Sequence, residues 1–191
     1  MQVITKEEFN LRKEELIDKI RHGSIFIYPT DTIYGLGCNA LNAESVKKIR
    51  EIKGRPKTPF SVIAPSKEWI IENTKCKDKT ESQWINKLPG PYTLICKLKS
   101  KEIVSKEVNP GLDSIGIRIP DHWIKDVSRI AKIPIVTTSA NKVDKDFMTS
   151  LDDLDPEIRG DVEFIIYEGE KKGRPSKIVF LDKKSVKIKE R

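Results

Sequence analysis

Apolar and polar positions follow two different periods along this chain. Runs such as 24–28 and 134–138 are rich in β-branched or aromatic residues and lie next to Gly, Pro or Ser, which predicts strands. Over 43–52 the apolar residues fall three apart, which predicts an amphipathic helix. The same patterns predict further strands at 60–64, 92–99, 114–119, 162–167, 177–181 and 185–189, and further helices at 5–21, 66–73, 79–87, 122–131 and 150–158.

The order of these elements predicts an α/β fold with a mixed sheet. Strands and helices alternate irregularly, and the last two strands are joined by the short turn Asp182-Lys183-Lys184, which predicts a hairpin. A hairpin pairs its strands antiparallel, so the sheet is not purely parallel. A chain of 191 residues is long enough for one substantial core, and no Gly/Ser-rich linker or internal repeat divides it.

A polar loop follows the apolar run at 24–28. Residues 28–37 read Tyr-Pro-Thr-Asp-Thr-Ile-Tyr-Gly-Leu-Gly. Pro29 opposes continuation as a central strand, and the hydroxyls and glycines after it allow the backbone to approach a ligand closely. The loop therefore predicts a ligand cradle, but Pro-Thr-Asp-Thr is also ordinary turn chemistry.

Two cations flank a glycine where the helix at 43–52 ends. Gly54 weakens the helix, and Pro56 favours an extended conformation at Arg55. Extended residues two apart point the same way, about 6.6 Å from each other. We therefore expect Lys53 and Arg55 to form a two-pronged cation; the alternative is a solvated basic helix end near the negative end of the helix dipole.

The strand at 134–138 becomes polar at its carboxyl end, where the chain reads Thr-Thr-Ser-Ala-Asn over 137–141. With period-two alternation, Thr137, Ser139 and Asn141 share one face. Ligands of open α/β sheets bind outside the carboxyl ends of strands, so we expect nucleotide contacts here. The alternative is a strand that ends in Ser and Asn turns.

Together these stretches resemble the YrdC-like family of L-threonylcarbamoyladenylate synthases. Five elements occur in the family's order and approximate spacing, and they cover nearly the whole chain: the loop 28–37, the Lys53-x-Arg55 pair, Leu-Pro-Gly-Pro-Tyr-Thr at 88–93, Ser-Ile-Gly-Ile-Arg-Ile-Pro at 114–120 and Thr-Ser-Ala-Asn at 138–141. The resemblance implies a single catalytic domain over 1–191, with a twisted mixed sheet and flanking helices around a concave, positively charged cleft.

The resemblance also implies a reaction. The enzyme would join L-threonine, bicarbonate and ATP into threonylcarbamoyl-AMP and release pyrophosphate, for modification of adenosine 37 in tRNAs that read codons beginning with A. Downstream tRNA-modification proteins would use the product. A carbamate oxygen must attack the α-phosphate, so two anions meet, and fixed positive charge lowers the barrier.

Residue by residue, the resemblance implies two sets of contacts. Those to ATP are Lys53, Arg55, Ser139, Asn141, Thr149 and Ser176, and those to threonine are Thr32, Arg118 and Thr138. The catalytic pair is Lys53 and Arg55, because both can neutralise carbamate and α-phosphate. The chain departs from the family where Lys142–Asp146 replaces a small residue and Gly after Asn141, and where Lys177 replaces a threonine.

We expect no protein-held metal. Two histidines and three widely spaced cysteines do not have metal-ligand spacing, so Mg²⁺ would arrive with the ATP phosphates. Thr5-x-x-Glu8 is a capping-box pattern that leads into a charged helix and fits neither a signal peptide nor a membrane span. We therefore expect a cytoplasmic protein that does not contact membranes.

The positive charge of the chain is concentrated at its C-terminal end. The net charge is +7, and residues 171–191 hold nine Lys or Arg against two Asp or Glu, so the first 170 residues are neutral overall. This basic C-terminal hairpin could bind tRNA or double-stranded RNA. It could equally be a solvated surface that keeps the protein soluble.

Two other functions fit parts of the pattern. One is a YrdC-like module that binds double-stranded RNA or tRNA without synthase activity; basic charge favours it, but the chain contains no recognisable RNA-binding motif. The other is carbamoyl-adenylate chemistry of the hydrogenase-maturation kind, in which a similar domain is embedded in a much longer protein.

Neutralising the hairpin should weaken tRNA binding without affecting adenylate synthesis. A variant with Gln at Lys183, Lys184, Lys187 and Lys189 releases fewer counterions on binding, so its affinity should fall and depend less steeply on salt. Binding measured at several salt concentrations gives both quantities. If affinity and salt slope stay unchanged, the hairpin is only a solvated surface.

Overall fold

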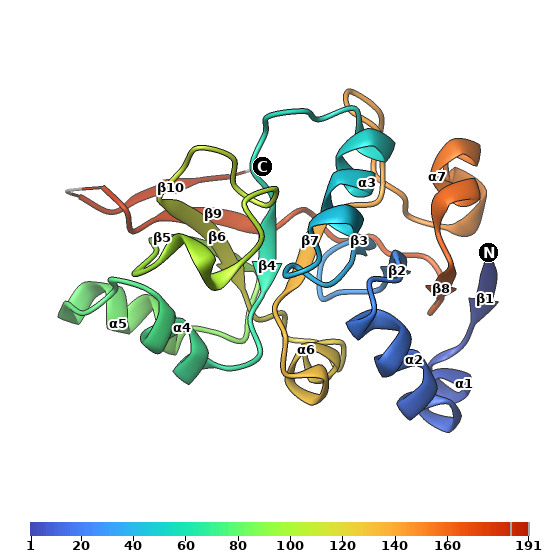
Figure 1. Cartoon of the computed structure of the whole chain (residues 1–191), viewed down its shortest axis with the longest axis horizontal. Helices are drawn as coiled ribbons and strands as arrows, with labels where there is room; N and C mark the ends of the chain where they lie inside the picture. The colour runs from blue at the N-terminus through green and yellow to red at the C-terminus, as the bar shows by residue number, and fades with distance from the viewer. Residues whose placement is uncertain (184, 191) are drawn as a thin grey trace.

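The computed structural model describes residues 1–183 and 185–190, so Lys184 of the expected hairpin turn lies outside the described residues. Within this part of the chain, ten strands form one twisted sheet in the order β1-β8-β2-β3-β7-β4-β6-β5-β9-β10 (Figure 1). The strands are β1 Gln2–Ile4, β2 Phe26–Tyr28, β3 Gly35–Gly37, β4 Ser61–Ile63, β5 Tyr92–Lys97, β6 Ser114–Arg118, β7 Ile135–Ser139, β8 Phe164–Ile166, β9 Lys177–Phe180 and β10 Lys187–Lys189. Parallel and antiparallel pairs both occur, including the antiparallel β9–β10 hairpin, which confirms the mixed α/β sheet.

Helices cover both faces of this sheet. They are α1 Lys6–Leu11, α2 Lys13–Arg21, α3 Ala43–Lys53, α4 Lys67–Asn73, α5 Lys79–Asn86, α6 Lys125–Ala131 and α7 Pro156–Asp161, with 3-10 turns at Lys101–Ile103 and Leu151–Asp153. The capping box of Thr5 and Glu8 starts α1 as expected. The expected helix 5–21 is divided at Arg12, and the expected helix 150–158 is a 3-10 turn followed by α7.

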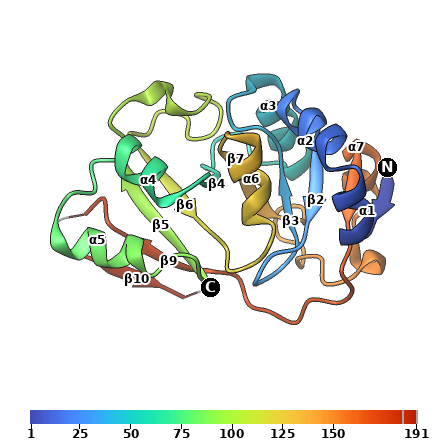
Figure 2. The same ribbon diagram turned by 90° about the horizontal axis from the view of Figure 1, so that it is seen from below.

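Alternation along the strands separates two hydrophobic clusters. Phe26 and Tyr28 of β2 belong to one cluster with apolar residues of α1, α2 and α6, whereas Ile27 between them belongs to the other, which includes residues of α3, α4, α5 and α7. Figures 1 and 2 show α6 and α2 side by side on one face of the sheet and α3 on the other. Neighbouring side chains of a strand point to opposite faces, so one three-residue strand contributes to both clusters.

Strand β3 lies inside the loop that the sequence predicted as a ligand cradle. It pairs antiparallel with β2, with Tyr28 opposite Gly35, and antiparallel with β7. A Cβ atom on Gly37 would lie 2.2 Å from the Val136 carbonyl oxygen, so only glycine fits this approach. Gly-Leu-Gly has low β-propensity, which is why sequence patterns missed the strand; they also missed β1.

No helix in the described part of the chain is long and apolar enough to cross a membrane. The three cysteines, Cys38, Cys76 and Cys96, are buried and not disulfide-bonded.

Gly37→Ala should destabilise the fold, because the added methyl group meets the Val136 carbonyl of β7. We expect the free energy of unfolding to fall by about 1–3 kcal/mol, as for other overpacked sites. The matched control is Gly160→Ala in α7, where no atom lies within 4 Å of the added carbon; it should be neutral or stabilise by up to about 1 kcal/mol. Equal stabilities of the two variants in denaturant titrations would contradict the close packing of β3 on β7.

Candidate active site

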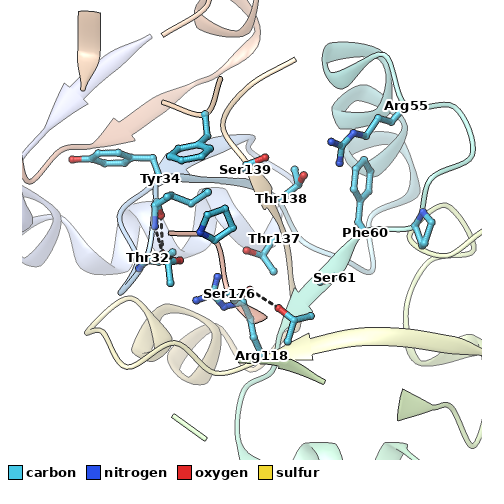
Figure 3. A pocket seen from close by; sticks show the side chains of 17 residues that line it. Thr32, Tyr34, Arg55, Phe60, Ser61, Arg118, Thr137, Thr138, Ser139 and Ser176 are labelled. Carbon is cyan, nitrogen blue, oxygen red and sulfur yellow. Dashed lines mark hydrogen bonds between the residues drawn. The ribbon is translucent and has the colours of Figure 1, made fainter. Parts of the chain in front are cut away.

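A cavity of about 280 Å³ lies where the β2–β3 loop meets strands β4, β5, β6 and β7 (Figure 3). Its lining is dominated by hydroxyl groups, with two arginines and several rings. The lining residues are Thr30, Thr32, Ile33, Tyr34, Gly35, Arg55, Pro59, Phe60, Ser61, Thr93, Arg118, Thr137, Thr138, Ser139, Phe147, Pro175 and Ser176. We call this space the first cavity.

The most unusual polar group of the first cavity is the guanidinium of Arg118, at the end of β6. Its Nη2 donates to Asp31 Oδ1 at 2.6 Å, and both side chains are nearly buried. Burial lowers the pKa of Arg118, and the Asp31 charge opposes that effect. The Nε of Arg118 is buried and has no hydrogen-bond partner among the described residues. A buried donor without a partner is costly, so the fold holds this guanidinium at the cavity wall at an energetic cost.

The β2–β3 loop is both a turn and a cavity wall. The Thr30 hydroxyl accepts from the amides of Thr32 and Ile33 at 3.0 and 3.2 Å and donates to the Ile33 carbonyl at 2.7 Å. These bonds are the turn chemistry that the sequence left as an alternative. They also fix the direction of Thr32 and Tyr34, whose side chains line the cavity.

The chain between β8 and β9 closes one side of the first cavity. Tyr34 donates its hydroxyl to the Gly169 carbonyl at 2.6 Å and accepts from the Glu168 amide at 3.0 Å. Gly173 lies so close to the Thr32 carbonyl that a Cβ atom would come within 2.0 Å of its oxygen. The Ser176 hydroxyl is hydrogen-bonded to that of Thr93 at 2.8 Å, which joins this segment to β5.

Lys53 and Arg55 do not point the same way, so the expected two-pronged cation is not formed. Helix α3 continues through Lys53, and Gly54 then adopts a left-handed conformation with φ 63°, which reverses the chain. Lys53 is fully buried, and its ammonium donates to the Ser139 carbonyl at 2.6 Å and to both oxygens of Asn141. Arg55 instead lines the first cavity, beside Phe60 (Figure 3).

A second cavity, of about 580 Å³, adjoins the first. It is lined by Asn141, Lys142, Lys145, Asp146, Phe147, Thr149, Asp153 and Asp155. Phe147 lines both cavities. Thr137, Thr138 and Ser139 all line the first cavity, so its lining does not follow the period-two pattern, and Asn141 lines the second, because the strand ends at Ser139 and the chain turns.

The structure therefore divides the expected site residues into three groups. Thr32, Arg55, Arg118, Thr138, Ser139 and Ser176 line the first cavity, Asn141 and Thr149 line the second, and Lys53 is buried behind the end of β7. In the described ranges, no three His, Cys, Asp or Glu side chains gather where they could hold a metal ion.

Comparison with known proteins identifies the family. The family model for Sua5, YciO and YrdC proteins, described as "Telomere recombination", matches residues 18–191. The chain belongs to the Sua5/YciO/YrdC family. A protein of Methanocaldococcus jannaschii named "Putative threonylcarbamoyl-AMP synthase" is 36% identical over 192 residues, which are 98% of this chain and 89% of that protein.

Longer members of the Sua5/YciO/YrdC family match over part of their length. The threonylcarbamoyl-AMP synthase of Pyrococcus abyssi is 35% identical over 79% of this chain, which spans only 45% of that protein. The crystal structure of P. abyssi Sua5 complexed with L-threonine superposes with a TM-score of 0.84 at 31% identity, over 98% of this chain and 56% of the solved one.

Several residues that line the site were not identified from the sequence. Asp31 lies within the quoted loop, and its position beside the threonines was the only signal for it. Thr93 lies in the quoted motif 88–93 but was given no role, and Phe60 and Phe147 line the first cavity without a motif that marks them. Their contribution depends on which strands become neighbours in the sheet, which single-sequence patterns do not give.

Lys53 should make stability depend on pH above neutrality. Burial, and then the nearby Arg55, lower the pKa of Lys53 from 10.5 to about 7. Between these pH values the unfolded chain holds one more proton than the folded chain at this residue, so its contribution to stability increases with rising pH and is lost as pH falls through 7.

Lys53→Met removes this titration, so its free energy of unfolding should vary less between pH 7 and 10 than that of the wild type. Denaturant titrations at several pH values measure the difference, with the exposed Lys47→Met as the control. Parallel pH profiles for wild type and Lys53→Met would contradict the buried titration.

Proposed function

We propose that this protein is an L-threonylcarbamoyladenylate synthase, which makes threonylcarbamoyl-AMP from L-threonine, bicarbonate and ATP. The observation that carries the proposal is the nearly buried guanidinium of Arg118, which lines the first cavity and is held there by Asp31. A guanidinium fixed at a cavity wall suits a carboxylate ligand. Sequence similarity to proteins named threonylcarbamoyl-AMP synthase supports the same reaction.

L-Threonine occupies the first cavity in this proposal. Its carboxylate accepts from Arg118, and its hydroxyl and amine meet the hydroxyls of Thr32 and Thr138, which line the same space. The cavity is small enough to enclose an amino acid and most of its wall is polar. Enclosure strengthens these contacts because few water molecules compete with them.

ATP lies across the boundary between the two cavities. Asn141 and Thr149 contact the nucleotide in the second cavity, and Ser139 and Ser176 contact it from the first. Arg55 reaches the phosphates, since it is the cation that faces the first cavity opposite Ser139 (Figure 3). Lys53 contributes to ATP binding indirectly. Its ammonium is hydrogen-bonded to Ser139 and Asn141 and so holds the segment that contacts the nucleotide.

The reaction needs positioning and positive charge but no side-chain nucleophile. The amine of threonine attacks bicarbonate and water leaves, which gives a carbamate. A carbamate oxygen then attacks the α-phosphorus of ATP, the bond to the β-phosphate oxygen breaks, and pyrophosphate departs. Arg55 stabilises the charge that develops on the phosphoryl oxygens, and the fixed walls hold the two reactants together.

Magnesium enters this proposal bound to ATP. Its usual ligands are phosphate oxygens, water and one or two carboxylates. Asp146, Asp153 and Asp155 line the second cavity, so this side could contribute a carboxylate. The Asp153 carboxylate already accepts from the amides of Thr149 and Ser150, and that of Asp155 accepts from the Glu157 amide, which makes Asp146 the better candidate.

The product would be passed to downstream tRNA-modification proteins in the cytoplasm. Lys187 and Lys189 are exposed on β10, at the edge of the sheet, where they can meet tRNA. Part of the hairpin's charge is balanced locally, since Lys177 pairs with Glu190 and Lys183 with Asp182. The edge strand is therefore the part of the basic hairpin that best fits an RNA contact.

Pyrophosphate release from ATP should require both threonine and bicarbonate, and AMP should be recovered in a threonine-containing product. Arg55→Ala should lower the rate about a hundredfold, the usual effect of removing one preorganised charge contact. The matched control is Arg129→Ala, which removes an exposed arginine on α6 and should keep full activity. Pyrophosphate formed equally fast without threonine, or full activity in Arg55→Ala, would contradict the proposal.

A further inference from the structure

Arg50 is a buried arginine that lines neither cavity, and no sequence motif marks it. It lies in the last turn of α3 and is only 6% exposed. Its guanidinium donates to four backbone carbonyls: Glu107 at 2.6 Å, Arg55 at 2.8 Å, Thr58 at 3.0 Å and Val108 at 3.3 Å. We infer that Arg50 is a positioning residue that holds the segment 55–60 in the shape that presents Arg55 and Phe60 to the first cavity. This inference rests on the proposed function.

The segment 55–60 has few other restraints. It contains two prolines, which lack an amide hydrogen. In the described part of the chain its backbone amides are bonded only at its two ends, Arg55 to the Arg50 carbonyl and Phe60 to the Val108 carbonyl. The side chain of Arg50 binds the carbonyls of Arg55 and Thr58, so it fixes the stretch between those ends.

Arg50 also fixes the ring at the end of the segment. The guanidinium carbon lies 4.6 Å from the centre of the Phe60 ring, and that ring is buried and lines the first cavity. The cation therefore supports one cavity wall from behind. The same guanidinium attaches the segment to 107–108 through the carbonyls of Glu107 and Val108.

The partners of Arg50 require its planar, forked shape. No carboxylate of the described residues forms an ion pair with it; all four acceptors are neutral carbonyls in separate directions. Burying a cation on neutral partners is costly, so a hydrophobic residue would be the simpler filling for this position. A lysine carries its three donors on one atom and cannot span four carbonyls. The four carbonyl acceptors therefore require the planar, forked guanidinium of an arginine at this position.

The test measures ATP and threonine binding to Arg50→Met by calorimetry, together with amide hydrogen exchange. We expect ATP affinity to fall about tenfold and threonine affinity to fall less, because Arg118 and Thr32 make no contact with Arg50 and only the Phe60 wall of the first cavity loses its support. Exchange at the Phe60 amide should accelerate. The control is Arg129→Met, which should change none of these. If Arg50→Met does not fold, Arg50→Lys keeps the charge and should show the same pattern.

A double variant separates positioning from general destabilisation. If Arg50 acts through Arg55, the Arg50→Met/Arg55→Ala pair should bind ATP no more than about twofold more weakly than Arg55→Ala alone. Additive losses, or wild-type ATP affinity in both Arg50 variants, would overturn the inference. Should the wild type bind no ATP, the proposed function fails, and exchange at the Phe60 amide still decides whether Arg50 orders the segment.

Discussion

The buried ion pair between Arg118 and Asp31 is the contact on which the site depends. It joins the end of β6 to the β2–β3 loop at 2.6 Å, with both side chains nearly buried. Removing one partner of such a pair leaves an uncompensated charge and commonly costs about 3–5 kcal/mol. The second oxygen of Asp31 accepts from the Asp121 amide, so the carboxylate also fixes the chain after β6. The pair therefore sets the spacing between two cavity walls and holds the Arg118 guanidinium at the wall of the first cavity.

The sheet order explains why these residues meet. Strands β3, β7, β4 and β6 are consecutive neighbours, although they come from positions 35 to 139 of the chain. Polar residues at the ends of these strands thus gather around one space. Three buried cations have separate tasks there: Arg118 holds a loop and faces the cavity, Lys53 holds the end of β7, and Arg50 holds the segment that carries Arg55.

Much of this arrangement could be predicted from the sequence. Short motifs near the ends of predicted strands identified Thr32, Arg118, Thr138 and Ser139. These residues line one cavity because the ends of neighbouring strands lie close together in the sheet. The direction of Lys53 could not be predicted, because it depends on the left-handed turn at Gly54 and on carbonyls more than 80 residues away.

Two other features depend on partners distant in the sequence. Local propensity opposes a strand at Gly-Leu-Gly. Strand β3 forms because this segment pairs with β2 on one side and with β7 on the other. In the sequence, Arg50 resembles an ordinary charged residue of a helix. It is buried because residues 107–108 lie beside α3 and accept its hydrogen bonds. Local patterns therefore identify strands and motifs, while long-range pairing decides which way a side chain faces.

In the proposed reaction Arg118 receives the carboxylate of threonine. Calorimetric titration of L-threonine into wild type and Arg118→Lys tests it most directly, with L-threoninol, which lacks the carboxylate, as the comparison ligand. Wild type should bind threonine at least about tenfold more tightly than threoninol, and folded Arg118→Lys should lose most of this preference, since lysine lacks the planar guanidinium. Equal affinity of wild type for the two ligands, or an unchanged preference in Arg118→Lys, would contradict it.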